Sequence, residues 1–400
     1  MRKIVSNQIL PNFRDRDAAA TIFAAAKFWQ KPEKKILENF FGSKNFFLTN
    51  AARTGISEIL KILKIAPKKK IVALPALICA VVAVPFLREN WQILWIDTDA
   101  CGRISRADFA KKADKFAVAV VPHIFGQKIE IEKFAEICRE KNIFLIEDCA
   151  HFLPNLRDQN FAADARIFSF GREKILSTIS GGAVQWPQNS ILKKNFSKIK
   201  LPKSKFFWTL RHIFQPLIFA VALRFWRAGG AILPRIFLKI GFLPRAVSKN
   251  EKRGIADFPR TKMPAAMQKI LVRQILNLKK IAAHREKIAK KWCEILPKIF
   301  PDREILVPKN FFRIILLAKN SAEKTEILRR AKKIGFFLSE WDGAPISPAG
   351  TDLPRFFYEK KMCENAENFA EKFVNFPTNL RTEIRDVEFF AKNFSRFSEK

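Results

Sequence analysis

A lysine after a strand-like run is the first residue in this chain that could do covalent chemistry. The stretch IFSFGREKILSTISGGAV (residues 167–184) leaves an apolar run at Ser169, turns at Gly171 and places Lys174 ahead of a glycine pair. The chain contains 73 Lys and Arg, so the residue type alone carries no information. Taken by itself, Lys174 reads as an ordinary turn residue. Its neighbours must decide whether it is a reactive amine.

Two carboxylates end another apolar run, FLIEDCAH (residues 144–151). A buried strand that stops on Glu147 and Asp148 must solvate or pair two charges, which is costly unless a cation or a polar ligand lies there. The alternative is a helix-capping Asp148 and a solvated Glu147. This pair is the second place where the sequence could carry chemistry.

Short apolar runs alternate with helical patterns through the middle of the chain. Residues 54–65 read as a helix before the first run, and residues 129–142 have apolar positions near i, i+3, i+4 and i+7. This alternation predicts an α/β fold with a mostly parallel sheet and helices on both faces, in which ligands gather at the carboxyl ends of the strands. The runs are KKIVALPAL (69–77), WQILWIDTD (91–99), FAVAVVPHIFG (116–126), IFLIEDCA (143–150) and ARIFSFG (165–171).

Composition and charge exclude several protein classes. With 400 residues, 48% of them hydrophobic and only 14 Gly, the chain is neither disordered nor collagen-like and is long enough for two domains. The net charge of +35 suits a nucleic acid, an anionic membrane or a phosphorylated substrate. The basic residues are spread along the chain, however, and short runs such as residues 67–70 are typical of solvated faces, so we expect no nucleic-acid partner.

The six cysteines indicate a reducing compartment. They form no CxxC pair and have no ligand-spaced histidine, so we expect neither a disulfide framework nor a metal site. The N-terminal segment lacks the apolar region that secretion needs. The sequence therefore predicts a cytoplasmic protein.

Taken together, the motifs resemble the DegT/DnrJ/StrS family of sugar aminotransferases that depend on pyridoxal 5'-phosphate. The resemblance covers roughly residues 35–190 and 258–396, including a long helix-like segment (262–292) and the ending (363–394). No single motif is specific, but the ordered set is. It consists of NAARTGISEIL, VALPALICAVV, VPHIFGQ, IEDCAH, ADARIFSFGREK and GGAV.

This resemblance implies a fold type I transferase that works as a homodimer. A large cofactor-binding domain would span residues 1–255, with an apolar helical insert at about 205–245, and residues 256–400 would form the connecting helix and a smaller α+β domain. Family relatives build each active site from two subunits, and residues 258–264 are placed to reach across.

The resemblance also implies roles for individual residues. Lys174 matches the lysine that forms a Schiff base with the cofactor and then carries a proton, and Asp148 matches the aspartate that pairs with the pyridinium nitrogen. His151 stands where the family has Gln or His beside the cofactor's phenolic oxygen. Ser169 would bind the phosphate, and Thr54, at the start of a helix, would share it.

Three departures from the family pattern change these expectations. Ala51-Ala52-Arg53 replaces the usual Ser-Gly-Thr, so phosphate binding would depend on the Arg53 guanidinium. Cys79 replaces the aromatic residue that stacks over the cofactor ring, which leaves His123 as a candidate for stacking. Where relatives carry Asn-Tyr-Arg, this chain has Arg260-Thr261-Lys262, which keeps positive charge but loses the amide.

The lysine favours transamination over dehydration, because family members that dehydrate sugars carry histidine at the position of Lys174. The implied reaction moves an amino group from glutamate to a nucleotide-linked keto-sugar, for surface glycan or secondary sugar biosynthesis. One alternative is a cofactor-binding regulator or scaffold without turnover. Another is a basic membrane- or nucleic-acid-associated protein that uses the fold as a platform.

The segment least like the family is residues 205–245. Its longest uncharged stretch before the glycines, 212–223, is too short for the ~20 apolar residues of a membrane-spanning helix. Phe and Trp interleaved with Lys and Arg favour a helix pair in a membrane interface, whereas an apolar insert packed against the enzyme explains the same composition. The sequence leaves both interpretations open.

Overall fold

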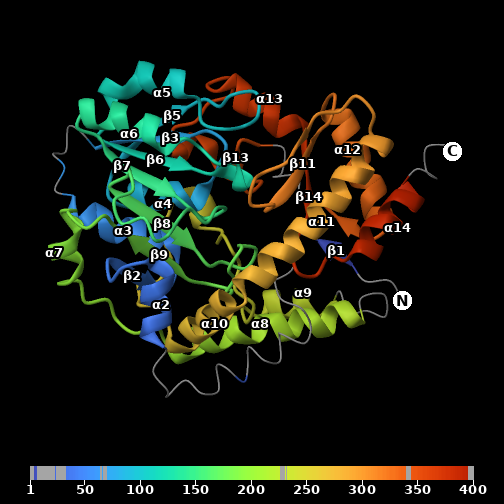
Figure 1. Ribbon diagram of the computed structural model, residues 1–400, viewed down its shortest axis with the longest axis horizontal. Coiled ribbons are helices and arrows are strands. Elements are labelled where there is room, and N and C mark those ends of the chain that lie inside the picture. The colour runs from blue at the N-terminus through green and yellow to red at the C-terminus, as the bar shows by residue number, and fades with distance from the viewer. Residues whose placement is uncertain are drawn as a thin grey trace.

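A seven-stranded sheet forms the centre of the larger part of the molecule (Figure 1). The computed structural model describes residues 4–6, 23, 33–63, 65, 70–225, 230, 232–338 and 344–394. Within the sheet, β9 runs antiparallel to both neighbours and the strands from β8 to β5 pair in parallel, so the predicted mostly parallel sheet is confirmed. The strand order is β2 (Phe46–Thr49), β9 (Gly182–Gln185), β8 (Ala165–Ser169), β7 (Phe144–Asp148), β6 (Val118–Pro122), β3 (Ile71–Pro75) and β5 (Gln92–Ile96).

Helices cover both faces of this sheet, which explains why its strands read as continuous apolar runs. Ile146 of β7 packs in a core cluster with α3 and α4, whereas Leu145 packs in a separate cluster with α5 and α6. Because side chains alternate along a strand, Asp148 points to the face of Ile146 and Glu147 to the face of Leu145. The helices are α2 (Lys34–Phe41), α3 (Ala52–Ile62), α4 (Ala80–Arg88), α5 (Arg106–Lys112), α6 (Ile131–Glu140) and α7 (Leu192–Phe196).

The C-terminal part contains a second, antiparallel sheet with its own core. Trp292 is fully buried there among the rings of Phe336, Phe376 and Phe390. The sheet has the order β10 (Ile305–Leu306), β11 (Arg313–Leu317) and β14 (Phe373–Pro377). The helices of this part are α11 (Leu278–Ile299), α12 (Ser321–Lys333), α13 (Glu364–Lys372) and α14 (Ile384–Phe394).

Two short strand pairs connect distant parts of the chain. Strand β1 (Val5–Ser6) pairs with β12 (Phe336–Phe337), so these first described residues lie on the C-terminal part, although the predicted domain division assigned them to the large domain. Strand β4 (Ile78–Cys79) pairs with β13 (Ile346–Ser347), which brings the C-terminal part to the edge of the large sheet. Otherwise the division at residue 255 stays a prediction.

The long helix expected at 262–292 is two helices. α10 (Ala265–Leu276) ends before Asn277, and α11 begins directly after it. The Asn277 side-chain amide donates to the Arg273 carbonyl oxygen at 2.8 Å. A side chain that donates to a helical carbonyl oxygen competes with the backbone amide that would otherwise donate to it. This competition accounts for the break between the two helices.

The insert folds as the expected pair of helices, α8 (Phe206–Arg224) and α9 (Ile232–Lys239), along the lower edge of Figure 1. One side of it is core, since Ile218, Phe219 and Leu223 are buried together with Ile4. Among the described helices α8 alone is long and apolar enough to cross a membrane, yet 44% of that stretch is buried inside the molecule. The insert is therefore packed against the protein on one side.

His212, on the buried side of α8, provides a test of that packing. Burial lowers its pKa to about 4, and the Trp208 carbonyl accepts from its ring at 2.6 Å. As the pH falls, the unfolded chain, whose histidine has a pKa of ~6.5, takes up a proton before the folded chain does. Burial of His212 should therefore lower the free energy of unfolding between about pH 6.5 and 4, by about 3 kcal/mol in total. We expect NMR titration to find the His212 imidazole neutral at pH 5.5. An ordinary histidine titration would mean that α8 is not packed as described.

Candidate active site

The predicted catalytic residues meet at the carboxyl ends of β7 and β8. Asp148 is the last residue of β7 and Ser169 the last of the neighbouring strand β8. Lys174 follows in the turn after β8, where its amide donates to the Gly171 carbonyl at 3.1 Å. This edge of a parallel sheet is where open α/β folds bind ligands.

Lys174 and His151 form a buried pair of nitrogen groups. Lys174 Nζ lies 2.8 Å from His151 Nε2, and the Phe125 amide donates to His151 Nδ1 at 3.2 Å. Because Nδ1 accepts, the proton of a neutral ring lies on Nε2, facing the lysine nitrogen. Burial lowers the pKa of Lys174, and it lowers the pKa of His151 well below the ordinary value, with the charges of Lys174 and Arg313 adding to the effect. Both shifts favour the uncharged form, and for the lysine this is the nucleophilic form.

The C-terminal part holds the His151 ring in place. The Phe312 ring lies nearly parallel to it at 4.7 Å, and Phe125 lies on a similar plane at 6.0 Å. The Asn310 side chain donates to the His151 carbonyl oxygen at 2.7 Å. The orientation of His151 toward the lysine therefore depends on contacts between the two parts of the molecule.

Asp148 is a buried carboxylate on the same face as Ile146. Burial raises its pKa, while the Ala150 amide, which donates to Oδ1 at 2.9 Å, and the charges of Lys174 and His123 lower it. A cationic group placed against this carboxylate would favour its ionised form. That property suits the predicted pairing with a protonated ring nitrogen.

Glu147 points to the opposite face and belongs to a separate network. Its Oε2 accepts from Arg166 Nε at 2.6 Å and its Oε1 contacts His123 Nε2 at 2.9 Å. Burial would raise the pKa of Glu147, but these two partners lower it overall. The alternative of a solvated Glu147 is therefore wrong. Removing one partner of such a buried pair typically costs about 3–5 kcal/mol.

His123 is occupied within this network. The Ile129 amide donates to its Nδ1 at 2.9 Å, its Nε2 faces Glu147, and its ring packs on Phe152 at 4.6 Å. Cys149 brings a third ligand-type atom within 4.8 Å, although Arg166 already holds Glu147. These contacts give His123 a structural task, and its stacking over a cofactor stays a prediction without geometric support.

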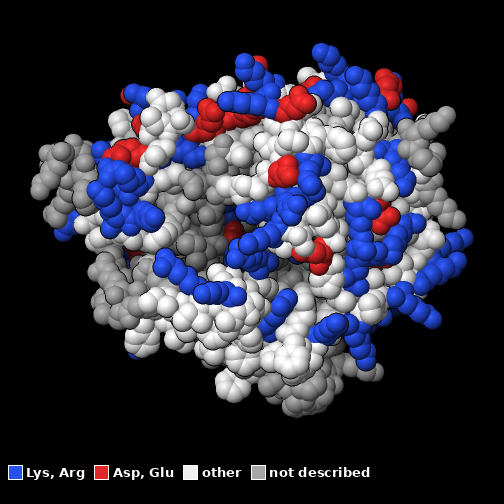
Figure 2. Space-filling model, turned by 180° about the vertical axis from the view of Figure 1, so that it is seen from behind, with Lys and Arg blue, Asp and Glu red and all other residues white. Residues whose placement is uncertain are grey.

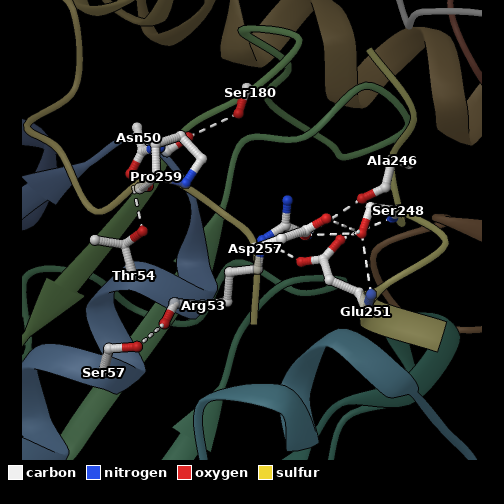
Figure 3. A network of polar contacts seen from close by, with 10 residues as sticks. All are labelled: Asn50, Arg53, Thr54, Ser57, Ser180, Ala246, Ser248, Glu251, Asp257 and Pro259. Carbon is white, nitrogen blue, oxygen red and sulfur yellow. Dashed lines mark hydrogen bonds and ion pairs between the residues drawn. The ribbon is translucent and has the colours of Figure 1, made fainter. Parts of the chain in front are cut away.

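Thr54 does not offer its hydroxyl to a ligand. The side chain is fully buried and donates to Asn50 Oδ1 at 2.8 Å (Figure 3). Asn50 in turn donates to the Pro259 carbonyl oxygen at 2.7 Å. The expectation that Thr54 shares a phosphate stays a prediction, and it would depend on the helix amides, because the hydroxyl fastens the start of α3 to the segment before α10. The first amides of α3 have no side-chain cap.

Arg53 points away from Thr54, toward the segment after the insert (Figure 3). Its Nε lies 3.0 Å from Glu251 Oε1, a guanidinium nitrogen donates to the Ala246 carbonyl oxygen at 3.2 Å, and its carbon lies over the Phe258 ring at 5.3 Å. The buried Glu251 neutralises much of the charge that an anion would feel. Phosphate binding by Arg53 stays a prediction.

The glycine pair allows β9 to lie against the start of α3. A Cβ on Gly182 would fall 2.4 Å from the Ala52 nitrogen, which no side chain tolerates. The Ser180 hydroxyl donates to the Asn50 carbonyl oxygen at 2.7 Å. Close backbone approach is therefore the reason for glycine at 182. Ser169, partly exposed nearby, accepts from the Gly171 amide at 3.4 Å.

Cys79 lies at the start of α4, opposite Ser347. Burial raises the pKa of its thiol, and the charges of Lys174 and Arg53 work against this rise. The thiol is therefore near the lysine, but it offers no aromatic surface for stacking.

The sequence reasoning missed the contribution of β11. Arg313, at its first position, donates to Glu173 Oε2 at 3.2 Å, one residue before the lysine. Arg285 of α11 is also buried, and burial together with Arg313 lowers its pKa to about 9. No motif surrounds these residues, and only the fold brings Arg313 near Lys174 and Arg285 near Arg313.

Comparison with known proteins gives a family match for the part of the chain that contains the large sheet. Residues 18–204 match the model of the DegT/DnrJ/EryC1/StrS aminotransferase family. The chain is 31% identical over 96 residues to GDP-perosamine synthase of Vibrio cholerae, covering 23% of this chain and 26% of that protein. It is 29% identical over 178 residues to the UDP-4-amino-4,6-dideoxy-N-acetyl-beta-L-altrosamine transaminase of Campylobacter jejuni subsp. jejuni serotype O:23/36 (strain 81-176), covering 43% of this chain and 46% of that protein. The matched segments thus span less than half the length of these relatives.

Solved structures show the same fold over the whole chain. Helicobacter pylori PseC, an aminotransferase involved in the biosynthesis of pseudoaminic acid, superposes with a TM-score of 0.73 at 14% identity, covering 100% of both chains. The putative sugar aminotransferase Spr1654 from Streptococcus pneumoniae, in its PMP form, gives a TM-score of 0.71 at 14% identity, covering 100% of this chain and 99% of that one. Residues 18–204 thus match the DegT/DnrJ/EryC1/StrS aminotransferase family model, and the chain has the fold of these solved aminotransferases.

Proposed function

We propose that this chain is an aminotransferase that uses pyridoxal 5'-phosphate to move an amino group from glutamate to a nucleotide-linked keto-sugar. The observation that carries the proposal is the 2.8 Å contact between Lys174 Nζ and His151 Nε2 at the strand edge that ends in Asp148. Relatives in the matched family act on sugar nucleotides by name, and one neighbour is known in both PMP and PLP forms.

The residues at this edge fit the cofactor. Lys174 would hold its aldehyde, Asp148 its ring nitrogen and His151 would lie beside its phenolic oxygen. Ser169 and the uncapped amides at the start of α3 would hold its phosphate. Once bound, pyridoxal 5'-phosphate supplies an electron sink for a carbon from which a proton is removed.

In this chain, the Lys174 amine is the group that can carry the proton during the reaction. Lys174 Nζ, whose pKa is lowered by burial, can take up a proton and release it again, and the contact with the His151 ring orients it. Arg313 and Glu173 fasten the lysine turn to β11, which excludes water from one side. A lysine at 174 favours amino transfer over dehydration, and the complete Lys174, His151 and Asp148 set gives the non-catalytic alternative no support.

We further propose a cytoplasmic homodimer, in which residues 258–264 contact the partner's site. Within its own chain, Arg260 pairs with Glu58 at 3.0 Å and Thr261 is buried. Lys262 is exposed and can reach outward. Light scattering of the purified protein tests the assembly.

Single-turnover chemistry tests the activity. Protein incubated with pyridoxal 5'-phosphate and glutamate should form one equivalent of 2-oxoglutarate per active site without any sugar, because the amino group is transferred in two half-reactions. Addition of a nucleotide-linked keto-sugar should restart the production of 2-oxoglutarate. The product is measured by mass spectrometry, and its absence with every amino donor tried would refute the proposed reaction.

A further inference from the structure

The outer side of the insert presents apolar side chains to solvent. On α8, Phe207 is 77% exposed and Val221 is 42% exposed. On α9, Ile232 and Ile236 are 55% and 50% exposed, and Ile240, directly after the end of the helix, is 67% exposed. Their spacing of four residues places them on one stripe. Together with Phe206 and Phe225, these residues are called the insert face. No described part of the chain covers it.

The insert face is fixed rather than a loose hairpin. Ile213 of α8 packs against Ala266 of α10, and Arg211 donates to the Gly241 carbonyl oxygen at 3.3 Å. The inner residues of both helices share a core cluster with Ile4 and Phe337. Because the inner side is anchored in the protein, the exposed stripe is a built surface with a constant orientation.

All charged residues of the insert itself are basic. From residue 203 to residue 250 the sequence has no Asp or Glu. Arg224, Arg235 and Lys239 are exposed next to the apolar stripe. In Figure 2, white surface dominates the lower edge of the molecule, with Lys and Arg side chains scattered above it. The basic residues of this stretch are Lys203, Lys205, Arg211, Arg224, Arg227, Arg235, Lys239, Arg245 and Lys249.

We propose that the insert face docks on an anionic membrane surface, with α8 and α9 lying in the plane of the headgroups. Aliphatic side chains enter the boundary of the acyl chains while the flanking cations meet acidic lipids. Since the inner side of α8 is packed against the protein, the helix lies on the bilayer and does not cross it.

Two other occupants fit less well. A second copy of this chain, joined by a two-fold axis, would place the same cations opposite each other without an acidic partner. A nucleic acid would accept the charge and could stack on Phe207, but it would leave the aliphatic Val221, Ile236 and Ile240 without an apolar partner. A lipid surface satisfies the cations and the aliphatic stripe together.

Co-sedimentation with vesicles tests this docking. The full chain should bind vesicles of phosphatidylcholine and phosphatidylglycerol and should not bind vesicles of phosphatidylcholine alone, and salt should weaken the binding. Val221→Ser, Ile236→Ser and Ile240→Ser combined should lower the affinity by at least about tenfold, because the apolar part of the binding is lost. The matched control combines Leu276→Ser, Val307→Ser and Met362→Ser, which are similarly exposed elsewhere (67%, 46% and 51%) and should bind as the wild type does.

Each alternative has its own result. Wild-type protein that ignores anionic vesicles, or a face variant that binds them like the wild type, overturns the proposal. A face variant whose mass by light scattering changes from dimer to monomer identifies a subunit interface and also overturns it. Near-ultraviolet circular dichroism checks that both variants are folded. None of these measurements depends on the proposed transferase activity.

Discussion

Lys174→Ala is expected to abolish the visible absorbance that the wild-type protein acquires with pyridoxal 5'-phosphate, and to lower amino transfer by about 10³-fold or more. The amine is the group that would hold the cofactor's aldehyde, and its burial beside His151 lowers its pKa, which favours the nucleophilic form. Alanine removes both the covalent attachment and the proton carrier. The measurements are the absorbance spectrum with its bleaching by borohydride, and the rate of 2-oxoglutarate formation.

Two variants make this result specific. Lys174→Arg keeps a cation at the site but cannot attach the cofactor, so it should be equally colourless. Lys193→Ala, at an exposed lysine of α7, should retain the band and the rate. Wild-type protein that stays colourless after incubation with cofactor, or a Lys174→Ala variant that keeps the band, would show that the amine has another role.

Asp148→Asn is expected to bind the cofactor and acquire the absorbance band, while turnover falls by about 10²- to 10³-fold. The amide has nearly the same shape and can keep the contact with the Ala150 amide, but it cannot stabilise a protonated ring nitrogen. Binding and chemistry should therefore separate. Spectral titration reports the first and single-turnover rates report the second.

The control for this variant is Asp158→Asn, at an exposed carboxylate of the same chain segment, which should behave as the wild type does. Unchanged turnover in Asp148→Asn would assign the carboxylate to a different task. Loss of both the band and the fold would indicate that the buried charge is structural.

The order of strands and helices could be predicted from the sequence because its signals are local. Apolar runs of seven to eleven residues predicted β3, β5, β6, β7 and β8 at the positions where the structure has them. The alternation of side chains along a strand depends only on neighbouring residues. Because parallel strands bring their carboxyl ends to one edge of the sheet, polar residues at those ends predict a ligand-binding site. Lys174 and Asp148 were found in this way, with the family resemblance supplying their roles.

Only the tertiary structure decided which polar partner each side chain takes. The Thr54 hydroxyl is fully buried against Asn50, and the Arg53 guanidinium pairs with Glu251, which lies far from it in the sequence. Such pairings depend on which loops pack beside the start of α3, and no local pattern records that choice. The insert is a second example. The composition of α8 is compatible with a helix in the protein core or at a membrane, and only the fold shows that one side of it is buried.

The sequence by itself determined the sheet, the helices around it and the chemical types at its carboxyl edge. The tertiary structure determined the environment that lowers the pKa of the lysine, because the contact with His151 and the Arg313 support of the turn join residues 23 and 140 positions apart. The physical reason is that secondary structure follows from short-range sterics and periodicity, whereas the protonation state of a buried amine follows from desolvation and from the charges that distant segments bring to it.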